Sequence, residues 1–235
     1  MIGRISGRPT QILLLVTPDA LAEAMCNGDV DVAMTNLGAY VQIRECSGTE
    51  AIAVLDAPVP VLEGYRGVLL ARRDAGVSNL AELKSRAGGL RYSEVLPGST
   101  SGALVQADAL RSIGAHASSF MALRHAGTHE GALTDLLTGR ADVGALAEEP
   151  WRKLQSDDPG SAARLTLLWR SDPLPPGPVV CRSRAVVDCD AIASELLGPS
   201  GGKAAEALSK GWAETAGATR FQAFAPARYD IFRAR

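Results

Sequence analysis

The chain has 235 residues, of which 46% are hydrophobic and 21% are charged, and its formal net charge is −2. This length and apolar fraction allow a sizeable core, in one large domain or in two smaller lobes. The sequence has no basic block and no aromatic-basic cluster, so nucleic acid is not an expected partner. Any bound anion must therefore be held by local geometry. No apolar run approaches the roughly 20 residues of a membrane-spanning helix.

The first residues do not have the pattern of an export signal. Arg4 and Arg8 precede an apolar run, Ile12 to Val16, that is too short for the core of a signal peptide and lacks a small-residue cleavage site. As written, the sequence predicts a cytoplasmic protein. A truncated N-terminus would instead place it in the periplasm or at the cell surface.

The four cysteines, Cys26, Cys46, Cys181 and Cys189, have no metal-site pattern. None belongs to a C-x-x-C pair and no histidine has metal-ligand spacing from them, so neither a metal nor another cofactor is expected. Cys26 falls late in a helical pattern, where a small buried apolar residue is expected. The even number permits disulfides, but the spacing supports no pairing.

Strands and helices alternate along the first part of the chain. The turn that contains Pro58, Pro60 and Gly64 interrupts this alternation. The patterns predict a buried strand over 11–16, a helix capped by Thr17 and ended by Gly28, a strand over 29–34, a short helix near 40–43, and strands over 51–55 and 67–71.

The alternation continues to the C-terminus and is typical of an α/β protein with mainly parallel sheets covered on both faces. The predicted strands are 89–95, 119–124, 141–146, 165–169 and 179–182. The predicted helices are 80–86 capped by Ser78, one after residue 102 with Leu104, Ala107, Leu110 and Ile113 inside, 129–138, one from 148, 189–197 and 203–215.

The turn from Leu96 to Gly102 joins a strand to a helix and carries three consecutive hydroxyl groups, on Ser99, Thr100 and Ser101. The first N–H groups of a helix have no partner inside it, and the helix dipole places partial positive charge there. The hydroxyls add donors, so this serine turn suits a tetrahedral oxyanion without help from a cationic side chain. The alternative is that a serine only caps the helix.

An internal repeat indicates two similar lobes. Thr17 lies eleven residues before Gly28, and Thr128 lies eleven residues before Gly139. Similar strand sequences follow the two glycines, over 29–33 and 140–144. Chance similarity between two helix–strand units is the alternative, because capped helices ending in glycine are common.

The repeat also exposes a gap. In the alignment of the two repeats, residues 35–36 correspond to residues 146–147. Both pairs of residues lie in turns after the carboxyl end of a strand, where open α/β sheets bind ligands. In the second lobe, a strand, the serine turn and a helix over 90–113 precede the repeat. Nothing comparable precedes Gln11, so the first lobe is expected to lack an opening strand and helix.

These segments resemble the substrate-binding proteins of phosphate and phosphonate ABC importers. The resemblance implies a two-lobed type 2 periplasmic-binding-protein fold with a mainly parallel sheet in each lobe and a cleft between them. Lobe 1 would comprise 1–66 and 171–235, shortened at its N-terminus, and lobe 2 would comprise 67–170. It rests on 28–33 with Tyr40, on 65–72, on Pro97 to Gly102 as its most specific motif, and on 127–130, 139–145, 167–171 and 224–233.

The resemblance implies a ligand site at the serine turn. Ser99, Thr100 and Ser101 would donate hydrogen bonds to a phosphonate or phosphate group. His129, at the start of its own helix, would be a further donor. The alternative for His129 is an ordinary residue of a first helical turn.

Further residues would surround the ligand. Tyr65 and Tyr40 would close the site with their hydroxyls, and Asn36 lies in the turn of the first lobe. Glu149, beside Glu148, would face an amino-bearing distal group. The alternatives are packed aromatic rings for the tyrosines and a solvated helix start for the glutamates.

Three functions are compatible with the sequence. The first is capture of a phosphonate- or phosphate-type oxyanion by lobe closure, as in ABC import, with an importer permease as partner and no catalysis. The second is an intracellular biosynthetic enzyme on the same fold, with His129 and Glu130, or Glu148 and Glu149, as acid and base. The third is a truncated product that folds poorly or only as a homo-oligomer, because the shortened lobe would expose a sheet edge.

Overall fold

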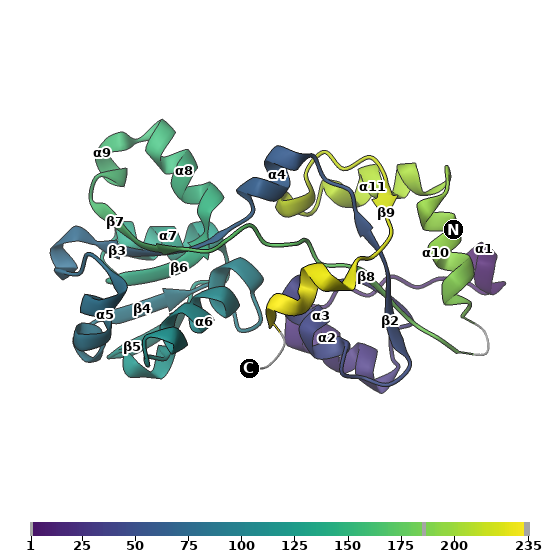
Figure 1. The fold of residues 1–235 in the computed structure, drawn as a ribbon, viewed down its shortest axis with the longest axis horizontal. Helices are drawn as coiled ribbons and strands as arrows, with labels where there is room; N and C mark the ends of the chain where they lie inside the picture. Colours follow the sequence, from purple (N-terminus) through teal and green to yellow (C-terminus); the bar gives the residue numbers. More distant parts are fainter. Residues whose placement is uncertain (1, 185–186, 233–235) are drawn as a thin grey trace. The chain divides into compact units, whose positions relative to one another are not determined.

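The chain forms two compact units in the computed structural model, which describes residues 2–184 and 187–232 (Figure 1). Unit 1 comprises Met1–Leu62 and Pro175–Arg235, and unit 2 comprises Glu63–Leu174. The chain therefore leaves unit 1 once and returns to it once. No described helix is long and apolar enough to cross a membrane.

Unit 1 is built on a four-stranded sheet in the order β1-β8-β2-β9. The strands are β1 (Val32–Met34), β2 (Thr49–Leu55), β8 (Val179–Arg182) and β9 (Phe221–Gln222). The helices are α1 (Ile2–Ser6), α2 (Pro18–Asn27), α3 (Leu37–Ile43), α4 (Val59–Gly64), α10 (Cys189–Leu197) and α11 (Gly201–Ser209), with 3₁₀ turns at Ala213–Thr215 and Pro226–Phe232.

The strands of unit 1 pair antiparallel, not mainly parallel as expected. β8 lies between β1 and β2 and runs against both. This strand belongs to the segment Pro175–Arg235, in which the chain returns from unit 2 to unit 1. It lies between two strands that come much earlier in the sequence. The alternation of helices and strands carries no information on such an insertion.

The sheet of unit 1 packs against a hydrophobic core on each face. Val180 joins a cluster with Met25 and Ile43 from α2 and α3. Its neighbour Cys181 faces the opposite side, in a cluster with Ile192 from α10. Successive side chains of β8 thus alternate between the two cores, as the period of a strand requires.

The predicted limits of the first long helix are confirmed. Thr17 accepts a hydrogen bond from Ala20 N at 3.2 Å, and Pro18 occupies the first turn of α2. Gly28 ends the helix with φ at 82°, a left-handed conformation that glycine adopts without a steric penalty.

The predicted buried strand over 11–16 is wrong. The segment is extended and exposed, and Leu14 retains 92% of its accessible surface. None of its backbone groups pairs with another strand in the described ranges. An apolar run indicates a buried strand only when a neighbouring strand accepts its hydrogen bonds, and the local sequence does not show whether one exists.

Unit 2 contains a five-stranded sheet in the order β5-β4-β6-β3-β7. The strands are β3 (Gly67–Arg72), β4 (Arg91–Glu94), β5 (Ala122–His125), β6 (Val143–Ala147) and β7 (Leu165–Arg170). The helices are α5 (Leu80–Arg86), a π-helical turn (Thr100–Leu104) that continues into α6 (Val105–Ser112), α7 (His129–Leu137), α8 (Glu148–Asp157) and α9 (Pro159–Ala162), with 3₁₀ turns at Arg73–Ala75, Ala87–Gly89 and Ala117–Ser119.

The sheet of unit 2 is mixed and is covered on both faces. β4 pairs parallel with β5 and β6, whereas β3 pairs antiparallel with β6 and β7. Leu69 of β3 faces a cluster with Leu110 of α6, and its neighbour Leu70 faces a cluster with Leu136 of α7. Helices α6 and α7 therefore cover opposite faces of the sheet.

Two local predictions in unit 2 are corrected. Asn79, not Ser78, caps α5, because Asn79 Oδ1 accepts from Glu82 N at 2.9 Å while the Ser78 hydroxyl bonds the Glu82 carboxylate. After the serine turn, Leu110 is buried as expected. The rest of the buried face is formed by Val105, Gln106 and Ala109 rather than by Leu104 and Ala107, because the π-helical turn changes the register of the helix that follows.

All four cysteines form disulfides, Cys26 with Cys46 and Cys181 with Cys189. The Cα atoms are 5.4 and 5.8 Å apart, within the usual range for disulfides. The expectation that Cys26 is merely a small buried residue is therefore wrong. Spacing could not show these pairs, because each links two elements that meet only in the folded unit.

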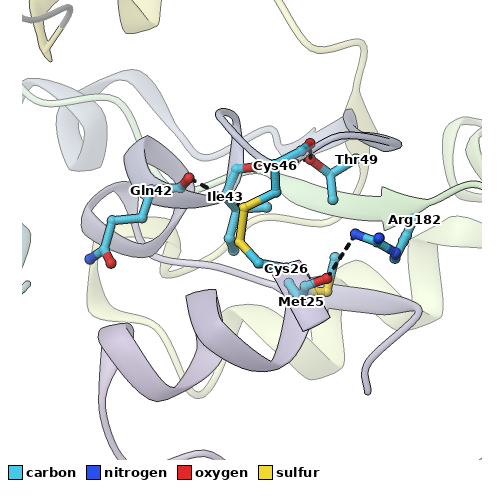
Figure 2. Close-up of a disulfide and its surroundings, with 7 residues drawn as sticks. All are labelled: Met25, Cys26, Gln42, Ile43, Cys46, Thr49 and Arg182. Carbon is cyan, nitrogen blue, oxygen red and sulfur yellow. Dashed lines mark hydrogen bonds between the residues drawn. A yellow bond between two sulfur atoms is a disulfide. The ribbon is translucent and has the colours of Figure 1, made fainter. Parts of the chain in front are cut away.

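The first disulfide joins Cys26, near the C-terminal end of α2, to Cys46 in the loop that follows α3 (Figure 2). Arg182 of β8 donates from Nη1 to Met25 O at 3.1 Å, next to Cys26. The Thr49 hydroxyl lies 2.7 Å from Cys46 O, beyond the other end of the bridge. The bridge therefore adds a covalent link where both helices already contact the sheet.

Candidate functional site

The serine turn follows β4 and is closed by its own backbone. Val95 N donates to Gly102 O at 3.0 Å, and Ser99 N donates to Leu96 O at 3.0 Å. Gly98 has φ at 77°, a left-handed conformation that favours glycine. Leu104 N then donates to Ser99 O at 2.9 Å and starts the helix. The sequence therefore folds locally into a strand, a tight turn and a helix, as predicted.

The hydroxyls of Ser99 and Ser101 are not used to hold this turn. Ser99 occupies the N-cap position but its side chain makes no capping hydrogen bond. Across the described ranges, neither hydroxyl is hydrogen-bonded to another protein group. Thr100 and Ser101 are each only 2% exposed. The turn therefore presents donors at a helix N-terminus that the fold itself does not require.

Gly102 brings Ser99 and His129 together. A Cβ atom at Gly102 would lie 2.9 Å from Ser99 Oγ and 2.9 Å from His129 Cε1. It would also lie 2.4 Å from the Val95 side chain, closer than such atoms can approach. Ser99 and His129 thus both lie beside the space that the missing side chain of Gly102 leaves open.

His129 is held in one tautomer by the backbone. It is the first residue of α7, after Thr128, whose hydroxyl caps the helix through Gly131 N at 2.9 Å. His129 Nδ1 accepts a hydrogen bond from Ala147 N at 2.9 Å. Burial lowers the pKa of the imidazole. A neutral ring with an accepting Nδ1 carries its proton on Nε2, which is therefore a hydrogen-bond donor.

Gln106 ties the serine turn to the sheet and was missed in the sequence. Its side chain is fully buried, and Nε2 lies 2.7 Å from Ser101 O, 3.1 Å from Val68 O and 3.2 Å from Leu146 O. Its Oε1 atom has no partner among the described residues. A glutamine in a helical pattern indicates a solvated face, so only the folded unit reveals this role.

The two ligand residues predicted in the first lobe, Tyr40 and Asn36, make contacts within unit 1. The Tyr40 ring packs edge-on against Phe224 and Tyr229, with centroids 5.5 and 5.4 Å apart. Asn36 Oδ1 caps α3 by accepting from Ala39 N at 2.7 Å. The packed-aromatic alternative therefore holds for the Tyr40 ring, and the ligand roles of both residues stay predictions.

The remaining predicted residues differ in their surroundings. Tyr65 is half-buried and its carbonyl accepts from Leu174 N at 2.8 Å. Glu148 is buried and paired with Arg170, whose Nη2 lies 2.8 Å from Oε2. Glu149 is exposed in the first turn of α8. The glutamates thus do not form an acid–base pair, because Glu148 is held as a structural carboxylate.

In the part of the chain that the structure describes, no group of three or more His, Cys, Asp or Glu side chains could hold a metal ion. The site consists of hydroxyl, imidazole and backbone donors. Such a set suits recognition of an oxygen-rich anion.

A family model described as "ABC transporter, phosphonate, periplasmic substrate-binding protein" matches residues 1–229. The chain belongs to this family. The resemblance seen in the sequence is confirmed, and so is the α/β class with two open sheets. The family consists of transporter substrate-binding proteins, so it supports the binding function over the enzyme alternative.

A curated relative is the phosphonates-binding periplasmic protein of Escherichia coli K12. It is 28% identical over 167 residues, which cover 69% of this chain and 48% of the relative. The chain thus spans about half the length of that protein.

Solved structures show the same fold. The binding protein component of an ABC phosphonate transporter from Pseudomonas aeruginosa matches with a TM-score of 0.69 and 19% identity, over 97% of this chain and 74% of that chain. A Prochlorococcus marinus protein in complex with methylphosphonate matches with a TM-score of 0.68 and 17% identity, over 98% and 86%. A Xanthomonas citri protein bound to ATP matches with a TM-score of 0.72 and 18% identity, over 97% and 85%.

Proposed function

We propose that this protein is a solute-binding protein that holds a phosphonate or phosphate group at its serine turn. The observation that carries the proposal is the pair of unused hydroxyls, on Ser99 and Ser101, at a helix N-terminus where the His129 ring, through Cε1, and Ser99 both border Gly102. A tetrahedral oxyanion accepts from several donors at once, and all of these donors belong to unit 2. Membership of the phosphonate-binding family supports the same ligand class.

The chemistry of this site relies on neutral donors. The helix N-terminus contributes N–H groups and partial positive charge, and the two serines contribute hydroxyls. His129 contributes a neutral N–H, because burial lowers its pKa. Affinity should therefore depend on geometry more than on ionic strength, since salt screens formal charges on exposed groups most strongly.

The second part of the proposal is closure of unit 1 over the anion. Tyr40 and Asn36 of unit 1 and Tyr65 of the crossover contribute polar groups to the closed site, and Thr100 completes the hydroxyl set. Glu149, exposed at the start of α8, faces an amino-bearing distal group. The hinge lies near residues 65–66 and 170–171, within a few residues of the two points, 62–63 and 174–175, where the chain passes between the units.

The protein works as the periplasmic component of an ABC importer and delivers its ligand to a permease. The family description supports this location and this partner. The disulfides of unit 1 support the location independently, because such bonds form and persist in oxidising compartments such as the bacterial periplasm.

Calorimetric titration of a Ser99→Ala, Ser101→Ala double variant tests the site. The ligands are methylphosphonate, 2-aminoethylphosphonate, phosphate and sulfate. Hydrogen bonds to a charged group contribute about 1.5–3 kcal/mol each, so the double variant should bind the preferred phosphorus oxyanion at least about 100-fold more weakly. Ser118→Ala, at an exposed serine of the same unit, is the matched control and should bind normally. Unchanged affinity in the double variant would exclude this site.

A further inference from the structure

Three neighbouring strands of unit 2 have their termini at one end of the sheet. β6 ends at Ala147, β3 begins at Gly67 and β7 ends at Arg170. Gly67 pairs with Ala147, and the next residue, Val68, pairs with Arg170. Neighbouring strands are about 4.8 Å apart, so the backbone of Arg170 lies about 9.6 Å across the sheet from the end of β6.

The serine turn lies against this end of the sheet. Gln106 Nε2 donates both to Ser101 O, at 2.7 Å, and to Val68 O, at 3.1 Å. A Cβ atom at Gly67 would lie 3.2 Å from Ser101 O, so the turn and the start of β3 are in contact. Because Val68 is the residue opposite Arg170, the serine turn and Arg170 are separated by the width of one strand.

Glu148 connects the histidine side of the site to Arg170. It follows Ala147, whose backbone N–H donates to His129 Nδ1 at 2.9 Å. Its Oε2 atom accepts from Arg170 Nε at 3.0 Å and from Arg170 Nη2 at 2.8 Å. The carboxylate of Glu148 therefore reaches from the end of β6 to the end of β7 and holds the guanidinium of Arg170 in place.

The guanidinium of Arg170 has donors that Glu148 does not use. It carries five N–H groups, and Glu148 accepts only along the edge formed by Nε and Nη2. Nη1 has no hydrogen-bond partner within 2–184 and 187–232. The Arg170 side chain is 46% exposed, whereas that of Glu148 is 5% exposed. The second edge, formed by Nη1 and Nη2, therefore remains available, and its shape matches a carboxylate.

A second arginine gives this end of the sheet an excess of positive charge. Arg66 O accepts from Glu148 N at 2.9 Å, and the Arg66 side chain donates to two backbone carbonyls, at 2.7 and 3.0 Å. In the described part of the chain Arg66 forms no ion pair. Arg66 and Arg170 thus share one buried carboxylate, that of Glu148. Glu63 and Glu149 are exposed, so solvent and salt screen their charges.

We propose that Arg170 is a specificity-determining residue that binds a second acidic group of the ligand, and that this group is a carboxylate. The inference rests on the proposed function, in which the phosphonate group occupies the serine turn. The carboxylate binds the unused edge of the guanidinium, and an amino group on the same ligand faces Glu149. The ligand class is therefore an amino acid whose side chain bears a phosphonate, of which 2-amino-3-phosphonopropionate is a simple example.

Calorimetric titration with a matched pair of ligands tests the proposal. 2-Aminoethylphosphonate and 2-amino-3-phosphonopropionate differ only by one carboxylate, and the wild-type protein should bind the second at least about tenfold more tightly. In a Glu148→Gln, Arg170→Gln variant this ratio should fall to about one. The double substitution removes both charges together, so no buried charge is left unpaired. A merely structural role of the pair would weaken both ligands equally and leave the ratio unchanged.

The control is Asp108→Asn, Arg111→Gln, which removes an exposed ion pair of α6 and should keep the wild-type ratio. If the first double variant does not fold, Arg170→Lys keeps a positive partner for Glu148 but not the two-nitrogen edge, and should also lower the ratio. Equal affinities of the two ligands for the wild-type protein, or a ratio that survives these substitutions, would overturn the inference and leave the proposed function intact. A wild-type protein that binds neither ligand nor phosphate would overturn both.

Discussion

His129 Nδ1 accepts a hydrogen bond from the backbone N–H of Ala147, at 2.9 Å. The bond links the first residue of α7 to the last residue of β6. It leaves Nε2 as the protonated nitrogen of the neutral ring, so a backbone amide on one element decides what the imidazole can offer to a ligand. The backbone amide of Ala147 thus selects the tautomer of His129.

Substitution of His129 by asparagine should separate the acceptor role of Nδ1 from the donor role of Nε2. Asparagine places its Oδ1 near the position of Nδ1 and keeps an acceptor for Ala147 N, but it has no counterpart of Nε2–H. We expect a melting temperature close to that of the wild-type protein and about 10- to 100-fold weaker binding of the preferred oxyanion. Glutamine, which keeps a donor near Nε2, should bind more tightly than asparagine; equal affinities would contradict the donor role.

The stability of the protein should depend on pH through His129. Burial lowers the pKa of His129 in the folded chain, so the unfolded chain takes up a proton first as the pH falls below about 6.5. The free energy of unfolding should decrease from that pH until it passes the lowered pKa. Urea titrations between pH 5 and 8 should show a smaller decrease in His129→Asn. Parallel pH profiles would rule out this contribution.

Replacing Gln106 by methionine should destabilise the protein and loosen the serine turn. Methionine has a similar size but cannot donate to the carbonyls of Ser101, Val68 and Leu146. Buried groups left without a partner cost about 1–3 kcal/mol. Urea denaturation should show this loss, together with weaker oxyanion binding at a temperature where the variant is folded. Gln155→Met, at an exposed glutamine of α8, is the control and should change neither value.

Replacing Gly102 by alanine should reduce oxyanion affinity by displacing Ser99 or His129. The added methyl group would meet Val95, Ser99 and His129 at 2.4, 2.9 and 2.9 Å. Overpacking of this kind costs about 1–3 kcal/mol of stability. Gly89→Ala is a suitable control, because a Cβ there would meet nothing within 4 Å. Full affinity in Gly102→Ala would show that the proximity of the two polar side chains is not required.

Loss of the Cys26–Cys46 disulfide should lower the free energy of unfolding by about 3 kcal/mol, the value that loop-closure entropy gives for a separation of 20 residues. Cys26 and Cys46 are half-buried, whereas Cys181 and Cys189 are buried. A mild reductant followed by alkylation and mass spectrometry should therefore label Cys26 and Cys46 first. Denaturation of a Cys26→Ser, Cys46→Ser variant measures the stability change, and simultaneous labelling of all four cysteines would contradict the order.

The sequence predicts those features that depend on a few adjacent residues. The caps at Thr17 and Thr128, the left-handed glycine at Gly28 and the serine turn are local, and all are found. Pairing of segment 11–16 depends on a neighbouring strand. The disulfide of Cys26 depends on how α2 meets α3, and the three contacts of Gln106 depend on two strands distant in sequence. None of these relationships is encoded in a local pattern.

The position of β8 in the middle of the unit 1 sheet affects the order in which the chain can fold during synthesis. Unit 2 is one continuous stretch, Glu63–Leu174, and all of its strands are available once the ribosome has passed that point. β1 and β2 are synthesised earlier, but neither can pair with β8 until Val179–Arg182 has been synthesised. The first segment of unit 1, Met1–Leu62, must therefore wait until unit 2 and β8 have been synthesised, and its apolar strands need protection from premature association in the meantime.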